Sequence, residues 1–443
     1  MSAVGRDGTG LAVADEVEVE VGAVAHGGHC VARHDGQVLF VRHALPGERV
    51  RARVTEVGSG ARFVRADAVA VLEASPDRVE PPCPWSGPGA CGGCDLQHVA
   101  LHRQRGLKAD VVREQLARLA GLDLDVAVEP VPGDDAGLGW RTRVEYAVDG
   151  TGRAGLRRFR SHDVVPVDRC RIATPAVQAL DVPGRPWAGA RAVDAVAPST
   201  GDPVVVPVGD RGAPLGEDPV LTESVDASWS GPAATGRLTR DLAVSARGFW
   251  QVHPGAAATF VAAAMAGLAV RPGERALDLY SGVGLFAAAL GEAVGADGQV
   301  VAVEADATAT EHARRNLADL PWVLPLQARV DDAFGVPRAS RAGGRGARRG
   351  RSRRPVRSPL LPTRADVVVL DPPRTVAGAD VVRAVAALGA RAVAYVACDP
   401  AALARDLRTF GETGYRVASL RAFDAFPMTH HVECVALLEP AAP

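Results

Sequence analysis

The chain reads Leu277-Asp-Leu-Tyr-Ser-Gly-Val-Gly284 at the junction between a short apolar strand and an apolar helix. This junction places the Asp278 carboxylate and two glycines at the end of the strand. Glycine lets the backbone approach a ligand closely, and the following helix opens its N-terminus toward that ligand. A glycine pair alone is a weak signal, so the surrounding pattern decides what it means.

From about residue 239 the chain alternates apolar strands with helical segments. The strands are expected at residues 275–279, 300–304, 366–371 and 392–396. Strands that alternate with helices form a parallel sheet that is covered on both faces. We therefore predict an α/β domain over residues 239–443, with a Rossmann-like, mostly parallel, doubly wound sheet.

Acidic residues follow the strands of this predicted sheet. Glu304 ends the strand after the glycine-rich junction, where doubly wound folds bind ribose hydroxyls with a carboxylate. The G-x-G-x-x-G fingerprint of dinucleotide enzymes is absent from the junction. The sequence therefore favours an S-adenosylmethionine site, with Asp331 or Asp332 after the third strand placed to reach the adenine.

Two further regions precede the α/β domain. Residues 10–75 alternate apolar and polar positions over short runs, which predicts a small OB-like β-barrel. Such barrels bind nucleic acid or serve as plain structural modules, and the pattern alone leaves both open. Residues 76–238 mix a helical stretch with short strands and loops rich in proline and glycine, which predicts a mixed α+β middle domain.

The composition of the chain limits its class. A length of 443 residues predicts two or three domains, and 47% hydrophobic residues predict a folded protein. No apolar run reaches the ~18 residues of a membrane span, and the N-terminus lacks the pattern of a secretory signal. We expect a cytoplasmic protein without membrane contact, and a monomer by default. The net charge of −2 decides nothing about nucleic acid, because phosphate binding depends on local basic surface.

An arginine-rich segment interrupts the α/β pattern. Residues 338–364 contain ten arginines and no acid. This composition cannot bury a core, so we predict a disordered insertion between two strands. A solvated loop and a flexible phosphate-binding arm are both compatible with it.

Four of the seven cysteines form a spaced group. Their pattern is Cys83-x7-Cys91-x2-Cys94, with Cys170 further along the chain. A long chain without a secretory signal favours metal binding or catalysis over disulfides. Four thiolates can hold zinc or a 4Fe-4S cluster, and their spacing alone does not decide between the two.

Two segments near the C-terminus carry reactive side chains. Cys398 follows a buried strand, where a loop can present a thiolate to a pocket. Cysteines beside apolar strands are more often inert packing, so position alone does not make this one a nucleophile. The second segment, Asp424-Ala-Phe-Pro-Met-Thr-His-His-Val-Glu433, ends in a glutamate.

Taken in order, these segments resemble the RNA uridine carbon-5 methyltransferase family, in the branch that carries a TRAM domain and an iron-sulfur cluster. The N-terminal region also looks like the TRAM barrel of that family, including Leu45-Pro-Gly-Glu48. The matching stretches of the C-terminal half are Phe249-Trp-Gln251-Val, Asp278-Leu-Tyr280-Ser-Gly-Val-Gly, Asp371-Pro-Pro-Arg374, the Cys398 segment and Phe426-Pro-Met-Thr-His-His-Val-Glu433.

The resemblance implies a reaction and its residues. A thiolate adds to carbon 6 of uracil because carbon 5 is too weak a nucleophile by itself, and a base later removes the proton on carbon 5. By resemblance the nucleophile is Cys398 and the base is Glu433. The residues implied for S-adenosylmethionine are Gln251, Tyr280, Glu304 and Asp371, with orientation of the target base as the alternative role of Asp371. Arg374 is implied to contact RNA or to stabilise the enolate.

The resemblance also bears on the metal and on the substrate. It favours a 4Fe-4S cluster on Cys83, Cys91, Cys94 and Cys170, with zinc as the lesser alternative. It favours 23S ribosomal RNA as substrate, with transfer RNA as the alternative. A nitrogen methyltransferase and a non-catalytic RNA-binding protein are weaker alternatives, because neither would need both Cys398 and Glu433.

The chain departs from the family pattern at two positions. The usual Ser-Cys-Asn-Pro reads Ala397-Cys-Asp-Pro400, which puts a carboxylate next to the thiol. A neighbouring negative charge raises the pKa of a thiol, so we expect Asp399 to oppose the activation of Cys398. His253 stands where the family often has asparagine.

Overall fold

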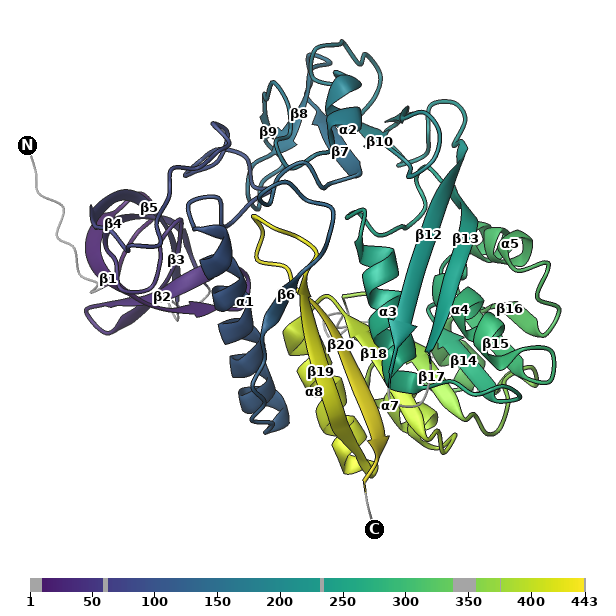
Figure 1. Ribbon diagram of the computed structural model, residues 1–443. Helices are drawn as coiled ribbons and strands as arrows, with labels where there is room; N and C mark the ends of the chain where they lie inside the picture. The colour runs from purple at the N-terminus through teal and green to yellow at the C-terminus, as the bar shows by residue number, and fades with distance from the viewer. Residues whose placement is uncertain (1–9, 59–62, 232–234, 338–355, 375, 442–443) are drawn as a thin grey trace, which may run out of the picture.

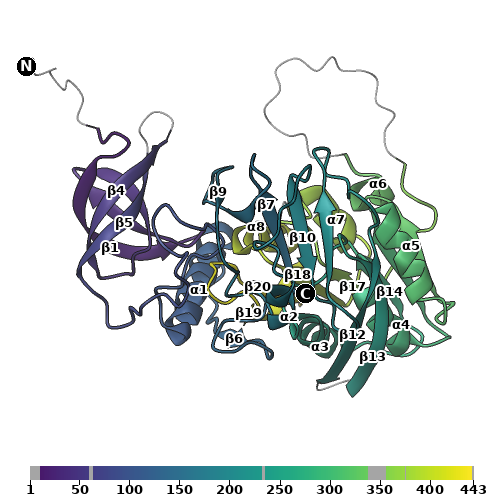
Figure 2. The same cartoon turned by 90° about the horizontal axis from the view of Figure 1, so that it is seen from above.

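The computed structural model describes residues 10–58, 63–231, 235–337, 356–374 and 376–441. The chain forms an N-terminal barrel and a large α/β unit, with a smaller sheet above the junction between them (Figure 1). The view from above shows helix α1 (Leu101–Gln115) between the barrel and the α/β unit (Figure 2).

The N-terminal strands close into a barrel in the order β1-β2-β3-β5-β4. Alternate residues face the barrel interior, as in β4, where Val50, Ala52 and Val54 are buried and the arginines between them are exposed. Burying alternate apolar residues gives the barrel its own core, so the expected OB-like barrel is confirmed. Its strands are β1 (Glu16–Ala25), β2 (His29–His34), β3 (Gln37–Arg42), β4 (Arg49–Val57) and β5 (Val64–Glu73).

An eight-stranded sheet forms the centre of the α/β unit. Its strands, in spatial order, are β16 (Val323–Gln327), β15 (Gln299–Glu304), β14 (Arg275–Leu279), β17 (Val367–Leu370), β18 (Ala392–Ala397), β20 (Glu433–Pro440), β19 (Tyr415–Asp424) and β6 (Val128–Pro130). The first five strands run parallel, whereas β20 is antiparallel to both β18 and β19. The expected mostly parallel sheet is confirmed.

Helices cover both faces of this sheet. Consecutive strand residues point to opposite faces, so Val368 and Val369 belong to two different cores. The first core packs against α3 (Ala256–Leu268), α4 (Leu285–Val294) and α5 (Ala307–Asn316). The second packs against α1, the π-helical turn η2 (Leu116–Ala120), α6 (Val330–Phe334), α7 (Ala379–Ala386) and α8 (Pro400–Glu412). Burial on both faces explains why the strands read as continuous apolar runs.

Residues 76–238 contribute to more than one structural unit. Part of this range forms a sheet of order β11-β10-β7-β8-β9 with the short helix α2 (Pro175–Ala179). The strands are β7 (Arg143–Val148), β8 (Ala154–Arg157), β9 (Val164–Val165), β10 (Ala192–Val196) and β11 (Val204–Val208). Helix α1 and strand β6, however, pack on the catalytic sheet. The expected boundary at residue 238 falls inside the hairpin of β12 (Val220–Ser230) and β13 (Thr235–Ser245).

The expected insertion at residues 338–364 is described only in part. Residues 338–355 lie outside the described residues. The end of the segment is ordered, which corrects the prediction there. Leu361 is 3% exposed within the second core, and the Arg357 guanidinium lies 5.6 Å from the Phe334 ring centroid. An apolar side chain and an arginine stacked on an aromatic ring anchor these residues despite the composition of the segment.

No helix in the described ranges has both the length and the apolar character that crossing a bilayer would require.

Candidate active site

A cleft of about 1670 Å³ lies at the carboxyl ends of the parallel strands. This is the edge where doubly wound sheets bind ligands. All six residues that the sequence assigned to cofactor binding or catalysis line this cleft. They are Gln251, Tyr280, Glu304, Asp371, Cys398 and Glu433.

The glycine-rich junction after β14 forms one end of the cleft. Tyr280, Gly282 and Gly284 all have positive φ angles, of 66°, 54° and 96°, so the two glycines occupy positions that other residues rarely adopt. Glu304 holds this turn in place, because its carboxylate accepts hydrogen bonds from the backbone N–H of Gly282 at 2.9 Å and of Asp306 at 2.7 Å. The junction is therefore fixed by the strand next to it.

Two acidic residues near this turn differ in their surroundings. Asp278 is fully buried, and burial together with the charges of Asp371 and Glu304 raises its pKa to about 8. Asp331 lines the cleft, and its carboxylate accepts hydrogen bonds from Arg329 at 3.0 and 2.8 Å. Of the two aspartates expected near an adenine, Asp331 is therefore the one that lines the cleft.

Cys398 and Glu433 are brought together by strand pairing. In the antiparallel register of β18 and β20, Ala397 pairs with Cys434. One step further in each strand places Cys398 opposite Glu433, although 34 residues separate the two in the sequence. Both line the cleft, and they influence each other electrostatically.

Burial sets the protonation of both groups. Burial and the neighbouring Glu433 raise the pKa of the Cys398 thiol to about 11, and the positive charge of the Arg374 guanidinium opposes this rise. Burial and Asp371 raise the pKa of Glu433 well above its ordinary value. A raised carboxyl pKa makes the carboxylate a stronger base once it has lost its proton.

Asp371 and Arg374 come from the segment that follows β17. Asp371 is half-buried, and the desolvation of its carboxyl group raises its pKa to about 7. Arg374 donates a hydrogen bond from Nη2 to Nε2 of His431 at 3.2 Å. These two residues therefore place two groups beside Cys398 and Glu433: a carboxyl group that changes protonation near neutral pH, and a positively charged guanidinium.

Asp399 does not act as the sequence predicted. Its Oδ1 accepts a hydrogen bond from the Ala402 N–H at 2.7 Å and caps helix α8, while Oδ2 lies 3.2 Å from Nε2 of His26 in the barrel. Burial alone would raise the Asp399 pKa, but the His26 and Ala402 hydrogen bonds lower the pKa to about 2. Burial and Glu433, rather than Asp399, are the largest causes of the raised Cys398 pKa.

His253 packs beside the cleft. It is 1% exposed, its ring stacks on Trp140 with centroids 5.8 Å apart, and its Nδ1 accepts a hydrogen bond from the Gly255 N–H at 3.2 Å. Burial lowers the His253 pKa to about 4, so the ring is neutral. This departure from the family pattern is accommodated by packing.

Several residues near the site carried no signal in the sequence. His26 and Asp95 touch the catalytic loops from more than 300 residues away. His430 and His431 belong to a quoted motif, but their partners come from elsewhere in the chain. Only the tertiary contacts identify them, since no local pattern marks a side chain for a distant partner.

The four grouped cysteines line a separate cavity of about 440 Å³. Burial raises the pKa values of all four thiols, and neighbouring thiols add to the rise for Cys91, Cys94 and Cys170. Among the residues that the structure describes, no group of three or more His, Cys, Asp or Glu side chains is arranged to hold a metal ion. The geometry thus brings the four sulfurs to one cavity without forming a single-ion site.

Known families match both ends of the chain. Residues 11–69 match the model of the TRAM domain, and residues 258–441 match the model of the tRNA (Uracil-5-)-methyltransferase family. The chain is similar to a protein of Streptomyces avermitilis described as an uncharacterized RNA methyltransferase, with 51% identity over 97% of this chain and 99% of that protein.

Two further relatives extend the comparison. The 23S rRNA (uracil(1939)-C(5))-methyltransferase RlmD of Halomonas elongata is 34% identical over 95% of this chain and 89% of its own length. The crystal structure of Pyrococcus abyssi tRNA (uracil-54, C5)-methyltransferase with S-adenosyl-L-homocysteine aligns with a TM-score of 0.62, covering 95% of this chain and 99% of that one. At 21% identity the latter likeness shows the fold alone. From the family matches and the RlmD relative we conclude that the chain belongs to the S-adenosylmethionine-dependent RNA (uracil-5) methyltransferase family and that its barrel is a TRAM domain.

Proposed function

We propose that the protein forms 5-methyluridine in RNA, with Cys398 as the nucleophile and Glu433 as the base. The observation that carries this proposal is that Cys398, the residue after β18, lies in register with Glu433 at the start of β20, and that both residues line the cleft. A packing cysteine would not need a buried carboxyl group directly across from it.

The residues divide the reaction into two stages. The Cys398 thiolate adds to carbon 6 of the uracil, so that carbon 5 becomes an enolate carbon able to attack a methyl group. Bound S-adenosylmethionine supplies that methyl group. Glu433 then removes the proton from carbon 5, and the carbon–sulfur bond breaks to release Cys398 as a thiolate. Because its pKa is raised, Glu433 holds the abstracted proton well.

Arg374 and Asp371 assist in this scheme. The Arg374 guanidinium lowers the Cys398 pKa and so increases the fraction of thiolate. We assign to the same positive charge the stabilisation of the negative charge that develops on the enolate oxygen. Asp371, with a pKa of about 7, can donate or accept a hydrogen bond and thereby orient either the cofactor or the base.

The cofactor is expected to bind along the β14 end of the cleft. We assign its contacts to Gln251, Tyr280, Glu304 and Asp371, all of which line the same cavity as the nucleophile. Glu304 already fixes the glycine turn and can accept ribose hydroxyls with its remaining lone pairs. The target uracil must leave its stack to reach Cys398, which favours a loop or a single strand.

We assign the substrate to 23S ribosomal RNA. The support is the 34% identical relative, whose name specifies that RNA and which aligns over 95% of this chain. Transfer RNA is the alternative, because the matched family model and the Pyrococcus abyssi structure both carry that name. We take the active form to be a monomer.

A methylation assay with the purified protein tests this proposal. Wild-type enzyme with S-adenosylmethionine is expected to form 5-methyluridine in 23S RNA from a strain lacking the gene, measured by mass spectrometry of mapped fragments. Cys398→Ala should abolish the product without weakening cofactor binding, and Glu433→Gln should leave a protein–RNA adduct on denaturing gels.

Cys434→Ala is the matched control, because this cysteine is the next residue after Glu433 but packs in the core on the opposite face of the sheet. It should methylate at the wild-type rate. A Cys398→Ala variant with full activity would exclude covalent catalysis. Methylation of transfer RNA but not 23S RNA would reassign the substrate and leave the mechanism intact.

We further propose that Cys83, Cys91, Cys94 and Cys170 hold a 4Fe-4S cluster, with zinc as the alternative. The support is a shared cavity of about 440 Å³, which exceeds the space of one ion, and a donor set made of thiols alone. Arg141 and Arg171 also line the cavity and would offset the negative charge of four thiolates.

Anaerobic purification distinguishes the two metals. We expect a brown protein with about four irons per chain that loses its visible absorbance in Cys91→Ser. A colourless, zinc-containing protein would favour the alternative, and a metal-free protein with wild-type stability would exclude both.

A further inference from the structure

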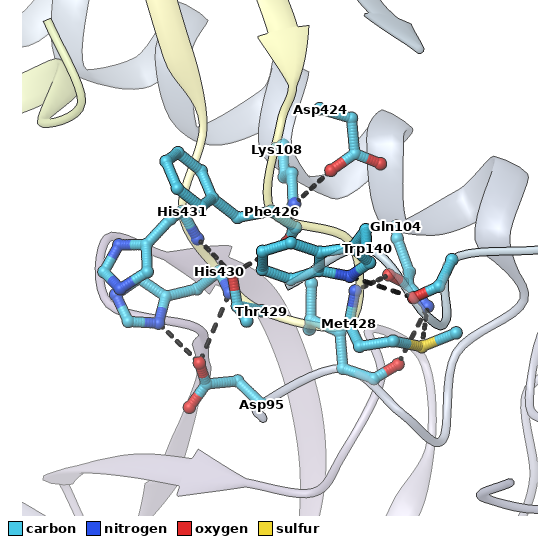
Figure 3. Close-up of polar contacts among 12 residues, drawn as sticks. Asp95, Gln104, Lys108, Trp140, Asp424, Phe426, Met428, Thr429, His430 and His431 are labelled. Carbon is cyan, nitrogen blue, oxygen red and sulfur yellow. Dashed lines mark hydrogen bonds and ion pairs between the residues drawn. The ribbon is translucent and has the colours of Figure 1, made fainter. Parts of the chain in front are cut away.

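The loop between β19 and β20 is held from outside the catalytic sheet (Figure 3). The Met428 carbonyl accepts hydrogen bonds from the N–H groups of Asp95 and Leu96, both at 3.0 Å. The Met428 N–H donates to Oε1 of Gln104 at 2.8 Å, and Met428 itself has a φ of 65°. The segment after Cys94 and the start of α1 therefore fix the backbone of this loop.

Asp95 also contacts the loop through its side chain. Its Oδ2 lies 2.6 Å from Nδ1 of His430 and accepts a second hydrogen bond from the His430 N–H at 3.3 Å (Figure 3). Oδ1 accepts a hydrogen bond from Arg42 of the barrel at 3.5 Å. Asp95 is only 6% exposed, so its orientation is set by these partners.

The contact continues from His430 to the neighbouring histidine. The rings of His430 and His431 have centroids 4.0 Å apart, and Nε2 of His431 lies 3.2 Å from Nη2 of Arg374. A guanidinium only donates hydrogen bonds, so Nε2 must accept and the His431 ring must be neutral. Burial, His430 and Arg374 lower the His431 pKa to about 3, which agrees with a neutral ring.

Arg374 completes the path to the reacting atom. Its guanidinium lines the same cavity as Cys398, His430 and His431, and its positive charge opposes the rise of the thiol pKa. A series of neighbouring side chains thus runs from Asp95 through His430, His431 and Arg374 to the thiol. The barrel also touches this chain, because a Cβ on Gly28 would lie 2.6 Å from Cβ of His430.

We propose that Asp95 is a positioning residue for the nucleophile: by fixing His430 and His431, it holds Arg374 in the orientation that assists Cys398. Asp95 directly follows Cys94, so the segment that carries the cysteine site also sets the geometry of the loop between β19 and β20. This inference rests on the proposed role of Cys398 as nucleophile.

The test compares Asp95→Ala and Asp95→Asn with the wild-type protein. Asparagine keeps a carbonyl oxygen that can accept from His430, whereas alanine removes both acceptors. Because small displacements near a reacting group are costly, we expect Asp95→Ala to lower kcat by about tenfold to a hundredfold with KM for RNA within about twofold. Asp95→Asn should recover most of kcat.

A second measurement follows the reactivity of the Cys398 thiol independently of the methylation assay. The rate of Cys398 alkylation by iodoacetamide, followed by peptide mass spectrometry, should fall about tenfold in Asp95→Ala because Arg374 no longer assists the thiolate. Asp77→Asn is the control, since the Asp77 carboxylate pairs with His102 and Arg103 at the start of α1 instead of with the loop. Its alkylation rate should match that of the wild type.

The outcomes separate the two proposals. A wild-type enzyme that forms no 5-methyluridine would exclude the proposed function, whereas an Asp95→Ala variant with unchanged kcat and unchanged Cys398 alkylation would exclude only the role of Asp95. If Asp95→Ala does not fold, His431→Ala tests the same chain from its other end, with the same loss expected and the same unchanged rates overturning it.

Discussion

At the scale of single residues, a buried ion pair fixes one end of the catalytic loop. Lys108, the only lysine in the chain, lies 2.5 Å from Oδ1 of Asp424, and both side chains are 1% exposed (Figure 3). Its Nζ also donates to the Phe426 carbonyl at 3.0 Å. Burial lowers the Lys108 pKa and Asp424 opposes this shift, so the charged lysine depends on its partner.

Lys108→Met should therefore destabilise the protein strongly. Removing one partner leaves the other charge buried and unpaired, which costs about 3 to 5 kcal/mol. Urea unfolding measures the effect. Arg421→Met is the matched control, because Arg421 pairs with Glu129 across neighbouring strands but the two side chains are 48% and 40% exposed. The control should cost less than about 1 kcal/mol, and equal losses in both variants would contradict the argument.

At the scale of elements, the sequence predicted much of what the structure shows. The apolar runs at residues 275–279 and 392–396 become β14 and β18, because strands buried on both faces must be apolar throughout. The antiparallel return of β20 beside β18 was not predicted. That pairing places Glu433 opposite Cys398, and it depends on the order of strands in space, which periodicity along the chain does not encode.

At the scale of the whole molecule, the barrel contacts Asp399, the residue that follows the proposed nucleophile Cys398. The Asp399 hydrogen bond raises the His26 pKa above its ordinary value of 6.5, and His26 in turn holds the Asp399 pKa at about 2. His26 contributes stability below pH 6.5 that is lost as the pH rises through its raised pKa. Asp399 contributes stability above its ordinary pKa of 3.8 that is lost as the pH falls toward 2. The ion pair is therefore complete between about pH 4 and 6.5.

A double-mutant cycle of His26→Ala and Asp399→Asn should detect this contact. The side chains are 39% and 26% exposed, so we expect a coupling free energy of only about 0.5 to 1 kcal/mol at pH 5.5. At pH 9 the coupling should fall toward zero, because His26 has lost its proton. Free energies of urea unfolding at both pH values give the cycle, and a coupling that does not change with pH would mean that the contact is not ionic.

The sequence by itself determined the architecture and the reactive groups. Apolar periodicity predicted the barrel and the doubly wound sheet, the resemblance of the ordered motifs singled out Cys398 and Glu433, and spacing grouped the four cysteines. Only the tertiary structure decided how these groups are held. Asp399 pairs with His26, and Asp95 reaches His430, through contacts between segments more than 300 residues apart. A local sequence pattern indicates which chemistry a residue can perform. The pKa and the orientation of that residue depend on neighbours that only folding brings within a few ångströms.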